Sequence, residues 1–474
     1  MKAKRMIAAL LALTAVFVIS GCARSQTAAP QQSAPQTQSA AEPSPQTAPA
    51  PQEGAAAKEK TPPTWRFEVE TRSEKGEYKA DDGTLLATVS YEYPRLVLKS
   101  DGDASGWEPP EDRQAACDAF NKEIEAYRAD LMSAEALGKE ALDWYNEMSA
   151  DARQYFPAYY RETSVVGSYL AGDLLCVNCA GGSYYGGAHG VESVFSWKFD
   201  LDAGEFFDWQ DLTDRPDALR EELAWNLLGK IEERGESDWC FEGYEDTILA
   251  KEDFNVSLGE TGMTVAFSEY EIMPYAGGIP EYEIPYAEFS RFLNARGERL
   301  LPLTPEDKAL GDYYEAEGLR YWLEGAMPMD ETDSVSQFVK STWGDYDMLY
   351  YRVDVPGVTT LAELRAKLLT RFSDELTERM LAGVTGEEYP LLREFDGKLY
   401  VLPAGRGADM YIDSVDYRAE LNADGSGGTV YATIHWRDYD EEKEEWVLTD
   451  ESIVEFPFET TGNGARFTDF TTIW

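Results

Sequence analysis

The sequence predicts an α+β protein in which two folded α+β domains follow a disordered tether. Some stretches alternate apolar and polar residues as half-buried strands do, and others repeat apolar residues at helical spacing. The two patterns do not alternate regularly along the chain, which is typical of α+β folds rather than of parallel sheets with crossover helices. At 474 residues, the chain is long enough for two or three domains with their own cores.

The first 21 residues have the pattern of a secretory signal peptide. Positive charges precede an apolar run over residues 6–19, and two small residues then lead to Cys22. The stretch 19–22 reads Ile-Ser-Gly-Cys and resembles a bacterial lipobox, in which the cysteine is acylated and becomes the mature N-terminus. We therefore expect Cys22 to anchor the protein by a lipid at the extracellular face of the cell membrane. The alternatives are a plain signal peptide and a short membrane helix.

Residues 22–64 form the predicted tether. Between residues 23 and 64 the chain has eight prolines and no aromatic side chain, a composition that buries too little surface to offset the entropy of folding. Charges cancel there, whereas the whole chain has 42 Lys and Arg against 88 Asp and Glu, a net charge of −46. The acidity therefore lies in the folded domains, where it excludes nucleic acid as a partner and leaves cationic partners open.

Residues 65–298 are predicted to form the first α+β domain. The expected elements are strands at 65–70, 86–93, 164–179 and 194–201, a mostly helical stretch at 112–149, a helix from about 217, a hairpin over 254–267 and a short helix at 286–293. Two loops, the glycine- and tyrosine-rich loop 181–190 and the loop 275–279, interrupt these elements.

The order of the stretches 181–190, 199–204, 270–278 and 284–286 resembles the paired DUF4163 and DUF3298 domains. That pair forms the extracellular region of lysozyme-sensing anti-sigma factors and the non-catalytic N-terminal region of some peptidoglycan deacetylases. The resemblance implies a binding or sensing module. The activity of the deacetylases does not carry over, because the metal-binding motif and the histidines of such a domain are absent from the sequence.

The two loops also supply the candidate partner-binding residues. His189 fits three roles, which are fixing its loop, contacting a ligand, and acid–base catalysis. Catalysis is the least favoured, because no neighbouring Ser or Cys–acid pattern completes a catalytic set, and no catalytic residue is predicted. Glycines permit close backbone approach, and the rings offer an aromatic surface. The candidates are Tyr184, Tyr185, Gly186, Gly187, His189 and Tyr275.

Four cysteines lie in the first domain: Cys117, Cys176, Cys179 and Cys240. In an exported protein, an even set predicts up to two disulfides, with free buried thiols as the alternative. The C-x-x-C spacing of Cys176 and Cys179 also occurs in redox and zinc sites, but here it lies in a strand-like context rather than at a helix start. Because the chain has only two histidines, far apart, we expect no metal site and no cofactor.

Residues 310–474 are predicted to form a second α+β domain. Helical patterns over 312–324, 360–369 and 373–381 precede a meander of strands that contains a turn at 422–428. Helices followed by antiparallel strands favour a cystatin-like sheet wrapped on a helix.

Short stretches of this second domain, among them 395–401, 456–459 and 466–470, resemble the IseA-type inhibitors of DL-endopeptidases. These inhibitors are cystatin-like proteins that block cell-wall hydrolases of the NlpC/P60 class. The resemblance implies that the second domain also acts without catalysis.

These observations together predict a non-enzymatic surface lipoprotein of a Gram-positive bacterium. Its expected partner is a basic cell-wall lytic enzyme, lysozyme or an NlpC/P60 DL-endopeptidase, which it binds and inhibits or senses. A binder of peptidoglycan or its glycan is the main alternative. A carboxylate-dependent wall hydrolase is less favoured, because no pair among the 88 acids is marked out for catalysis.

Overall fold

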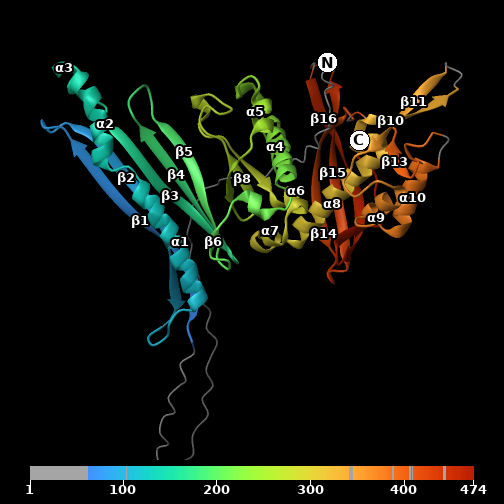
Figure 1. Cartoon of the computed structure of the whole chain (residues 1–474), viewed down its shortest axis with the longest axis horizontal. Coiled ribbons are helices and arrows are strands. Elements are labelled where there is room, and N and C mark those ends of the chain that lie inside the picture. Colours follow the sequence, from blue (N-terminus) through green and yellow to red (C-terminus); the bar gives the residue numbers. More distant parts are fainter. Residues whose placement is uncertain are drawn as a thin grey trace, which may run out of the picture.

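A computed structural model describes residues 62–102, 104–340, 345–386, 389–404, 407, 409–440, 443 and 445–473. The predicted signal peptide, the lipidation site Cys22 and the tether up to residue 61 lie outside these residues. The folded part is α+β, as predicted, and has three neighbouring parts (Figure 1). Within the described ranges, no helix combines the length and the apolar character needed to span a bilayer.

The first part is a six-stranded sheet with the strand order β1-β2-β3-β4-β5-β6. Neighbouring strands are antiparallel except β2 and β3, which run parallel because the helices of this part cross over between them. β1 and β2 pair along almost their whole length, so this hairpin is longer than the sequence predicts. The strands are β1 Thr64–Lys79, β2 Leu85–Asp101, β3 Tyr159–Ala171, β4 Leu174–Tyr184, β5 Val191–Asp200 and β6 Glu205–Phe206.

Helices α1 and α2 lie along one face of this sheet (Figure 1). Phe120 and Ile124 of α1 are buried at the predicted helical spacing. The predicted helical stretch is divided because Ser133 caps α2, where its side chain accepts a hydrogen bond from the backbone N–H of Ala136. The helices of this part are α1 Glu111–Asp130, α2 Ala134–Glu147 and α3 Ala150–Arg153.

The central part combines a three-stranded antiparallel sheet with helix α4 and several short helices. Leu219, Leu223 and Leu227, which the sequence places on one face of α4, are completely buried. The predicted hairpin is present as β7 and β8. The elements are β7 Asn255–Leu258, β8 Gly262–Ala266, β9 Glu281–Pro285, α4 Pro216–Glu233, α5 Tyr244–Ala250, α6 Tyr286–Phe289 and α7 Ala295–Leu300, with 3-10 turns η1 Trp209–Leu212, η2 Ser237–Trp239, η3 Tyr275–Gly277 and η4 Ser290–Phe292.

Strand β4 joins the first part to the central part because it is buried on both faces. Leu175, Val177 and Cys179 pack with residues of α1, whereas Leu174 and Cys176 belong to the core of the central part. Successive side chains of a strand point to opposite faces, so alternation sends these five residues into two different cores. The two cores are therefore continuous through this strand.

The C-terminal part contains two four-stranded antiparallel sheets, with the orders β10-β11-β13-β12 and β14-β15-β16-β17. Helix α8 lies against the second sheet, where the Tyr313 ring is 5.0 Å from that of Tyr417 and 4.9 Å from that of Phe456. A sheet packed on a helix agrees with the predicted arrangement, but the sequence does not predict β10. The elements are α8 Pro305–Tyr321, a π turn at Trp322–Ala326, β10 Met329–Val339, β11 Tyr346–Val353, α9 Leu361–Leu368, α10 Asp374–Thr385, β12 Leu392–Phe395, β13 Lys398–Val401, β14 Ile412–Leu421, β15 Gly427–Asp440, β16 Glu445–Thr461 and β17 Gly464–Phe467.

Helix α8 also forms the junction with the central part. Thr304 caps it by accepting a hydrogen bond from the Asp307 backbone N–H, and the Asp307 side chain bonds back to Thr304. The helix then packs against α6 and η4. Arg291 of η4 lies over the ring of Tyr314 at 5.7 Å and pairs with Glu222 of α4 at 2.7 Å. The C-terminal part therefore follows the central part without an intervening linker.

Candidate functional site

The candidate site is formed by two loops that the fold brings together. We call its aromatic side chains the loop surface: Tyr160, Tyr184, His189, Tyr270 and Tyr275. The loops are the connection from β4 to β5 and the connection from β8 to β9, which correspond to the two predicted loops, and Tyr160 belongs to the neighbouring strand β3. Each loop is shaped by residues with positive φ angles.

The β4–β5 loop reverses sharply after Tyr184. Gly186 and Gly187 have φ angles of 88° and 106°, which residues with a side chain rarely adopt. The Tyr184 hydroxyl donates a hydrogen bond to the Gly187 carbonyl at 3.0 Å and closes the turn. This geometry explains why glycine is needed at both positions, and it carries the chain into His189.

The β8–β9 loop is anchored at its base. The Glu271 carboxylate accepts a hydrogen bond from the Ser268 backbone N–H at 2.8 Å and forms an ion pair with Lys251. Between these anchors, Tyr270 has a φ of 63°, an unusual conformation for a residue with a side chain. The loop then forms the short turn η3, which begins at Tyr275.

The rings of His189, Tyr270 and Tyr275 form one stack. The His189 ring lies 3.9 Å from that of Tyr275 with an interplanar angle of 26°, and 6.0 Å from that of Tyr270. Tyr270 is 50% exposed and Tyr275 is 38% exposed. The stack therefore presents aromatic surface to solvent while its rings hold one another in place.

Both ring nitrogens of His189 make hydrogen bonds. Nδ1 lies 2.8 Å from the Gly190 carbonyl oxygen, which can only accept, so Nδ1 carries a proton. In the neutral ring, Nε2 is then the acceptor of a bond from the Tyr270 hydroxyl at 3.0 Å. His189 thus orients Tyr270, and this arrangement favours the loop-fixing and ligand-contact roles over acid–base catalysis.

Carboxylates surround the loop surface. Tyr160 stacks on Tyr184 with the rings 6.0 Å apart, and burial raises the pKa of the Tyr160 phenol. The negative charges of Glu162, Glu192 and Glu269 raise this pKa further. One oxygen of Glu269, Oε2, is buried, and no group among the described residues donates a hydrogen bond to it. A buried acceptor without a donor is costly, so a donor or a cation is favoured there.

The structure divides the predicted binding residues between two places. His189 and Tyr275 meet in the stack. Tyr184 stacks on Tyr160, and its ring also lies 6.1 Å from that of Tyr159, which Tyr185 contacts at the same distance. Tyr270 was not predicted, although its stretch carried the family resemblance, because a tyrosine in a loop gives no sign that its φ angle turns it toward a distant histidine.

The predicted disulfides are not formed in the structure, where the four cysteines are free. Cys176 and Cys179 are three residues apart in β4, so their side chains point to opposite faces and enter different cores. Burial raises the pKa of the Cys179 thiol to about 12 and that of the Cys117 thiol to about 11. The Cys117 and Cys179 thiols are therefore protonated at neutral pH.

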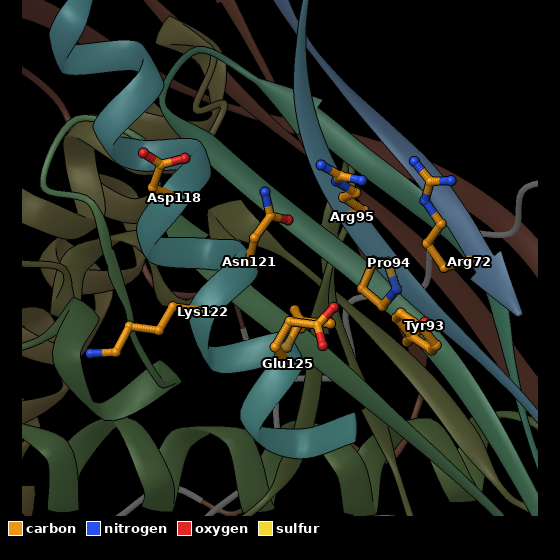
Figure 2. Close-up of a pocket in the computed structure, with 9 residues that line it drawn as sticks. Arg72, Tyr93, Pro94, Arg95, Asp118, Asn121, Lys122 and Glu125 are labelled. Carbon is orange, nitrogen blue, oxygen red and sulfur yellow. The ribbon is translucent and has the colours of Figure 1, made fainter. Parts of the chain in front are cut away.

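No other site stands out in the described ranges. They contain no group of three or more His, Cys, Asp or Glu that could hold a metal ion. A hollow of about 530 Å³ lies between α1 and the strands β1 and β2, and Figure 2 shows the side chains that line it. Asn121 in this hollow is occupied by hydrogen bonds to the backbone of Leu96, and Lys122 points away from the strands. The remaining charges are mixed in sign, so this hollow does not define a ligand.

Comparison with known families places the β8–β9 loop inside a segment that matches one family. Residues 215–287 match DUF3298, a family described as protein of unknown function. This confirms the DUF3298 part of the resemblance, whereas the DUF4163, IseA-type and lipobox parts stay predictions. Tyr270 and Tyr275 lie inside the matched segment and His189 lies outside it.

Two solved structures are similar to part of the chain. A DUF3298 family member from Bacteroides fragilis is 20% identical, and the match covers 49% of this chain and 96% of that one, with a TM-score of 0.34. A DUF3298 family protein from Pseudomonas aeruginosa is 17% identical, with 50% and 98% covered and a TM-score of 0.33. No curated protein matches the chain.

Proposed function

We propose that the protein is a non-catalytic surface lipoprotein that binds a basic cell-wall lytic enzyme through the loop surface and thereby inhibits or senses it. The observation that carries this proposal is the exposed stack of His189, Tyr270 and Tyr275 with carboxylates around it. Ring faces attract Lys and Arg side chains, and carboxylates add a charge-assisted hydrogen bond. Lysozyme or an NlpC/P60 DL-endopeptidase is the expected partner, because both belong to the outer face where Cys22 would anchor the chain.

The net charge of −46 supports the same partner class. A negative field over the whole molecule speeds the approach of a basic protein and makes the association sensitive to salt. A non-catalytic role is supported by His189, whose ring nitrogens contact a carbonyl and a phenol rather than a serine or a cysteine among the described residues.

Calorimetric titration of the full chain with lysozyme and with an NlpC/P60 enzyme tests the proposal. We expect binding at low salt that weakens as salt rises, and a loss of at least tenfold in affinity for Tyr275→Ala. Tyr346→Ala, which removes an exposed tyrosine of β11 in the C-terminal part, is the matched control and should bind as the parent does. The proposal is wrong if neither enzyme binds at low salt.

Binding of peptidoglycan glycan is a second candidate, which the exposed ring stack also favours, because sugar faces pack on aromatic rings. This candidate predicts retention of the full chain on purified cell-wall sacculi that persists at high salt and is lost in Tyr275→Ala. Retention that disappears with salt argues for the basic partner instead.

A further inference from the structure

A second exposed aromatic surface lies at the far end of the hairpin formed by β15 and β16. β14 begins at Ile412, which pairs with Trp436. Residues 437–440 and 445–448 therefore pair with each other beyond the first residue of β14. Their last described pairs are Tyr439 with Trp446 and Asp440 with Glu445. This end of the hairpin therefore presents both of its faces outside the packed sheet.

One face of this end carries a contiguous apolar group. Strand alternation places Tyr439 and Arg437 on the same face. On this face Tyr439 pairs with Trp446 and Arg437 pairs with Leu448 of the neighbouring strand. The Trp446 ring lies 5.7 Å from that of Tyr439 and 6.2 Å from that of Tyr411, which precedes β14. We call this group the hairpin face: Met410, Tyr411, Tyr439, Trp446 and Leu448, each between 39% and 67% exposed.

Contiguous exposure of this kind needs an explanation. Single exposed apolar side chains are ordinary, but a group of large ones rimmed by polar residues marks an interaction surface. Trp and Tyr are also the side chains most enriched at the energetic centres of protein interfaces. The hairpin face therefore has the composition of a docking surface rather than of a solvated strand end.

The charged side chains around the hairpin face indicate which class of partner binds there. The cations of the hairpin are already engaged, because Arg437 lies over the Trp446 ring at 5.0 Å and pairs with Asp413 at 3.5 Å, and Lys443 pairs with Asp440 at 3.1 Å. Among the described residues 409–413, 437–440, 443 and 445–451, seven acids stand against these two cations: Asp409, Asp413, Asp438, Asp440, Glu445, Asp450 and Glu451. The excess is therefore negative.

We infer that the hairpin face is a docking surface for a basic polypeptide segment with apolar side chains. Its apolar groups would pack on Trp446 and Tyr439, and its Lys or Arg side chains would meet the surrounding carboxylates. A second copy of this chain and an anionic lipid surface both carry the wrong charge for this rim. The inference goes beyond the proposed function, because it adds a contact on another unit of the molecule.

The test uses the full chain carrying Tyr275→Ala, so that the loop surface does not contribute. A fluorescent peptide of alternating lysine and leucine is titrated and its anisotropy measured, with an alternating glutamate and leucine peptide as the charge control. We expect the lysine peptide to bind and the glutamate peptide not to bind. Adding Tyr439→Ala and Trp446→Ala should weaken the lysine peptide at least tenfold, whereas Ile453→Ala, another exposed apolar residue of β16, should have no effect.

Three outcomes would overturn the inference. In the first, the lysine peptide binds equally well to the protein with Tyr439→Ala and Trp446→Ala and to the protein with Ile453→Ala, while both proteins unfold at the same temperature as the parent. The second is equal binding of the two peptides, which would indicate apolar adhesion without charge recognition. The third is self-association of the full chain in sedimentation that Trp446→Ala abolishes, which would make a second copy the occupant. None of these results depends on whether lysozyme binds at the loop surface.

Discussion

The loop surface and the hairpin face use the same kinds of side chain, but the fold holds them differently. In the loop surface, His189 stacks on Tyr275 at 3.9 Å and accepts a hydrogen bond from Tyr270, so three rings from two distant loops fix one another. At the hairpin face, Trp446 contacts Tyr439, Tyr411 and Arg437 by ring packing. The loop surface is therefore held by a hydrogen bond as well as by stacking, and the hairpin face is held by ring packing on strands that extend beyond β14.

This difference sets what each surface can do. An ordered surface loses little side-chain entropy on binding, so it selects a partner by geometry. A surface held by ring packing depends more on charge and apolar area. We therefore expect the loop surface to determine partner identity and the hairpin face to add affinity.

The largest expected effect concerns the stability of the junction where α8 packs against α6 and η4, which joins the central part to the C-terminal part. Burial raises the pKa of Glu288 and of Glu317 to about 7, and the nearby Glu222 raises that of Glu288 further. Lys230, 3.9 Å from Glu288, opposes these effects. Both pKa values are higher in the folded state than in the unfolded state. The two protonated carboxyls therefore contribute to the stability of the folded state fully below pH 4.5, and this contribution is lost as the pH rises through 7.

We therefore expect the protein to lose stability relative to a Glu288→Gln, Glu317→Gln double variant between pH 5 and pH 8. The loss is at most ~3 kcal/mol for each carboxyl, the free energy of the pKa shift. Urea denaturation at four pH values measures it. Glu306→Gln on the exposed start of α8 is the control, and curves for parent and double variant that stay parallel would contradict the assignment.

The next effect tests whether order in the loop surface matters. A Cβ at Gly190 would lie 2.4 Å from the Tyr160 hydroxyl and 2.9 Å from the Ser183 carbonyl oxygen, so Gly190→Val should displace Tyr160 and cost about 1–3 kcal/mol. We expect lysozyme affinity to fall at least tenfold in calorimetry. Gly229→Ala, a glycine substitution in α4 with open space around it, should leave affinity unchanged.

A smaller effect separates hydrogen bonding from ring area. Tyr270→Phe keeps the ring but removes the bond to His189, which should weaken partner binding by about 0.5–1.5 kcal/mol. The equivalent change at the other surface, Tyr439→Phe, keeps the contact with Trp446 and should leave binding of the lysine peptide as it was. Equal losses at the two surfaces would show that they are held in the same way.

The smallest effect comes from His435, in the C-terminal part. His435 lies between Asp416 at 2.8 Å and Glu451 at 3.2 Å, and the hydrogen bond to Asp416 raises its pKa. A raised histidine pKa contributes stability below pH 6.5 that is lost as the pH rises through the folded-state value. His435→Gln should therefore lose up to about 1 kcal/mol in urea denaturation at pH 5.5 and less at pH 8.5.

Much of the fold follows from periodicity, but the site depends on contacts that periodicity does not contain. The leucines of α4 repeat so regularly that their burial is predictable. β10 was missed because it is a largely polar edge strand in which only Val339 is buried. His189 and Tyr275 could be proposed singly from their glycine-rich stretches. Their stacking across 86 positions of sequence, and the left-handed Tyr270 beside them, depend on the tertiary fold.

The two-sided burial of β4 has a consequence for how the molecule can be divided. The family match covers residues 215–287, yet the core of that segment includes Leu174 and Cys176 from the strand far upstream. A fragment that begins at residue 215 would leave these neighbours behind, among them Cys176, whose sulfur lies 3.3 Å from the backbone nitrogen of the buried Leu258. The matched segment is thus part of a larger folding unit, and we expect it to aggregate when expressed alone and to remain soluble when β1 to α7 accompany it.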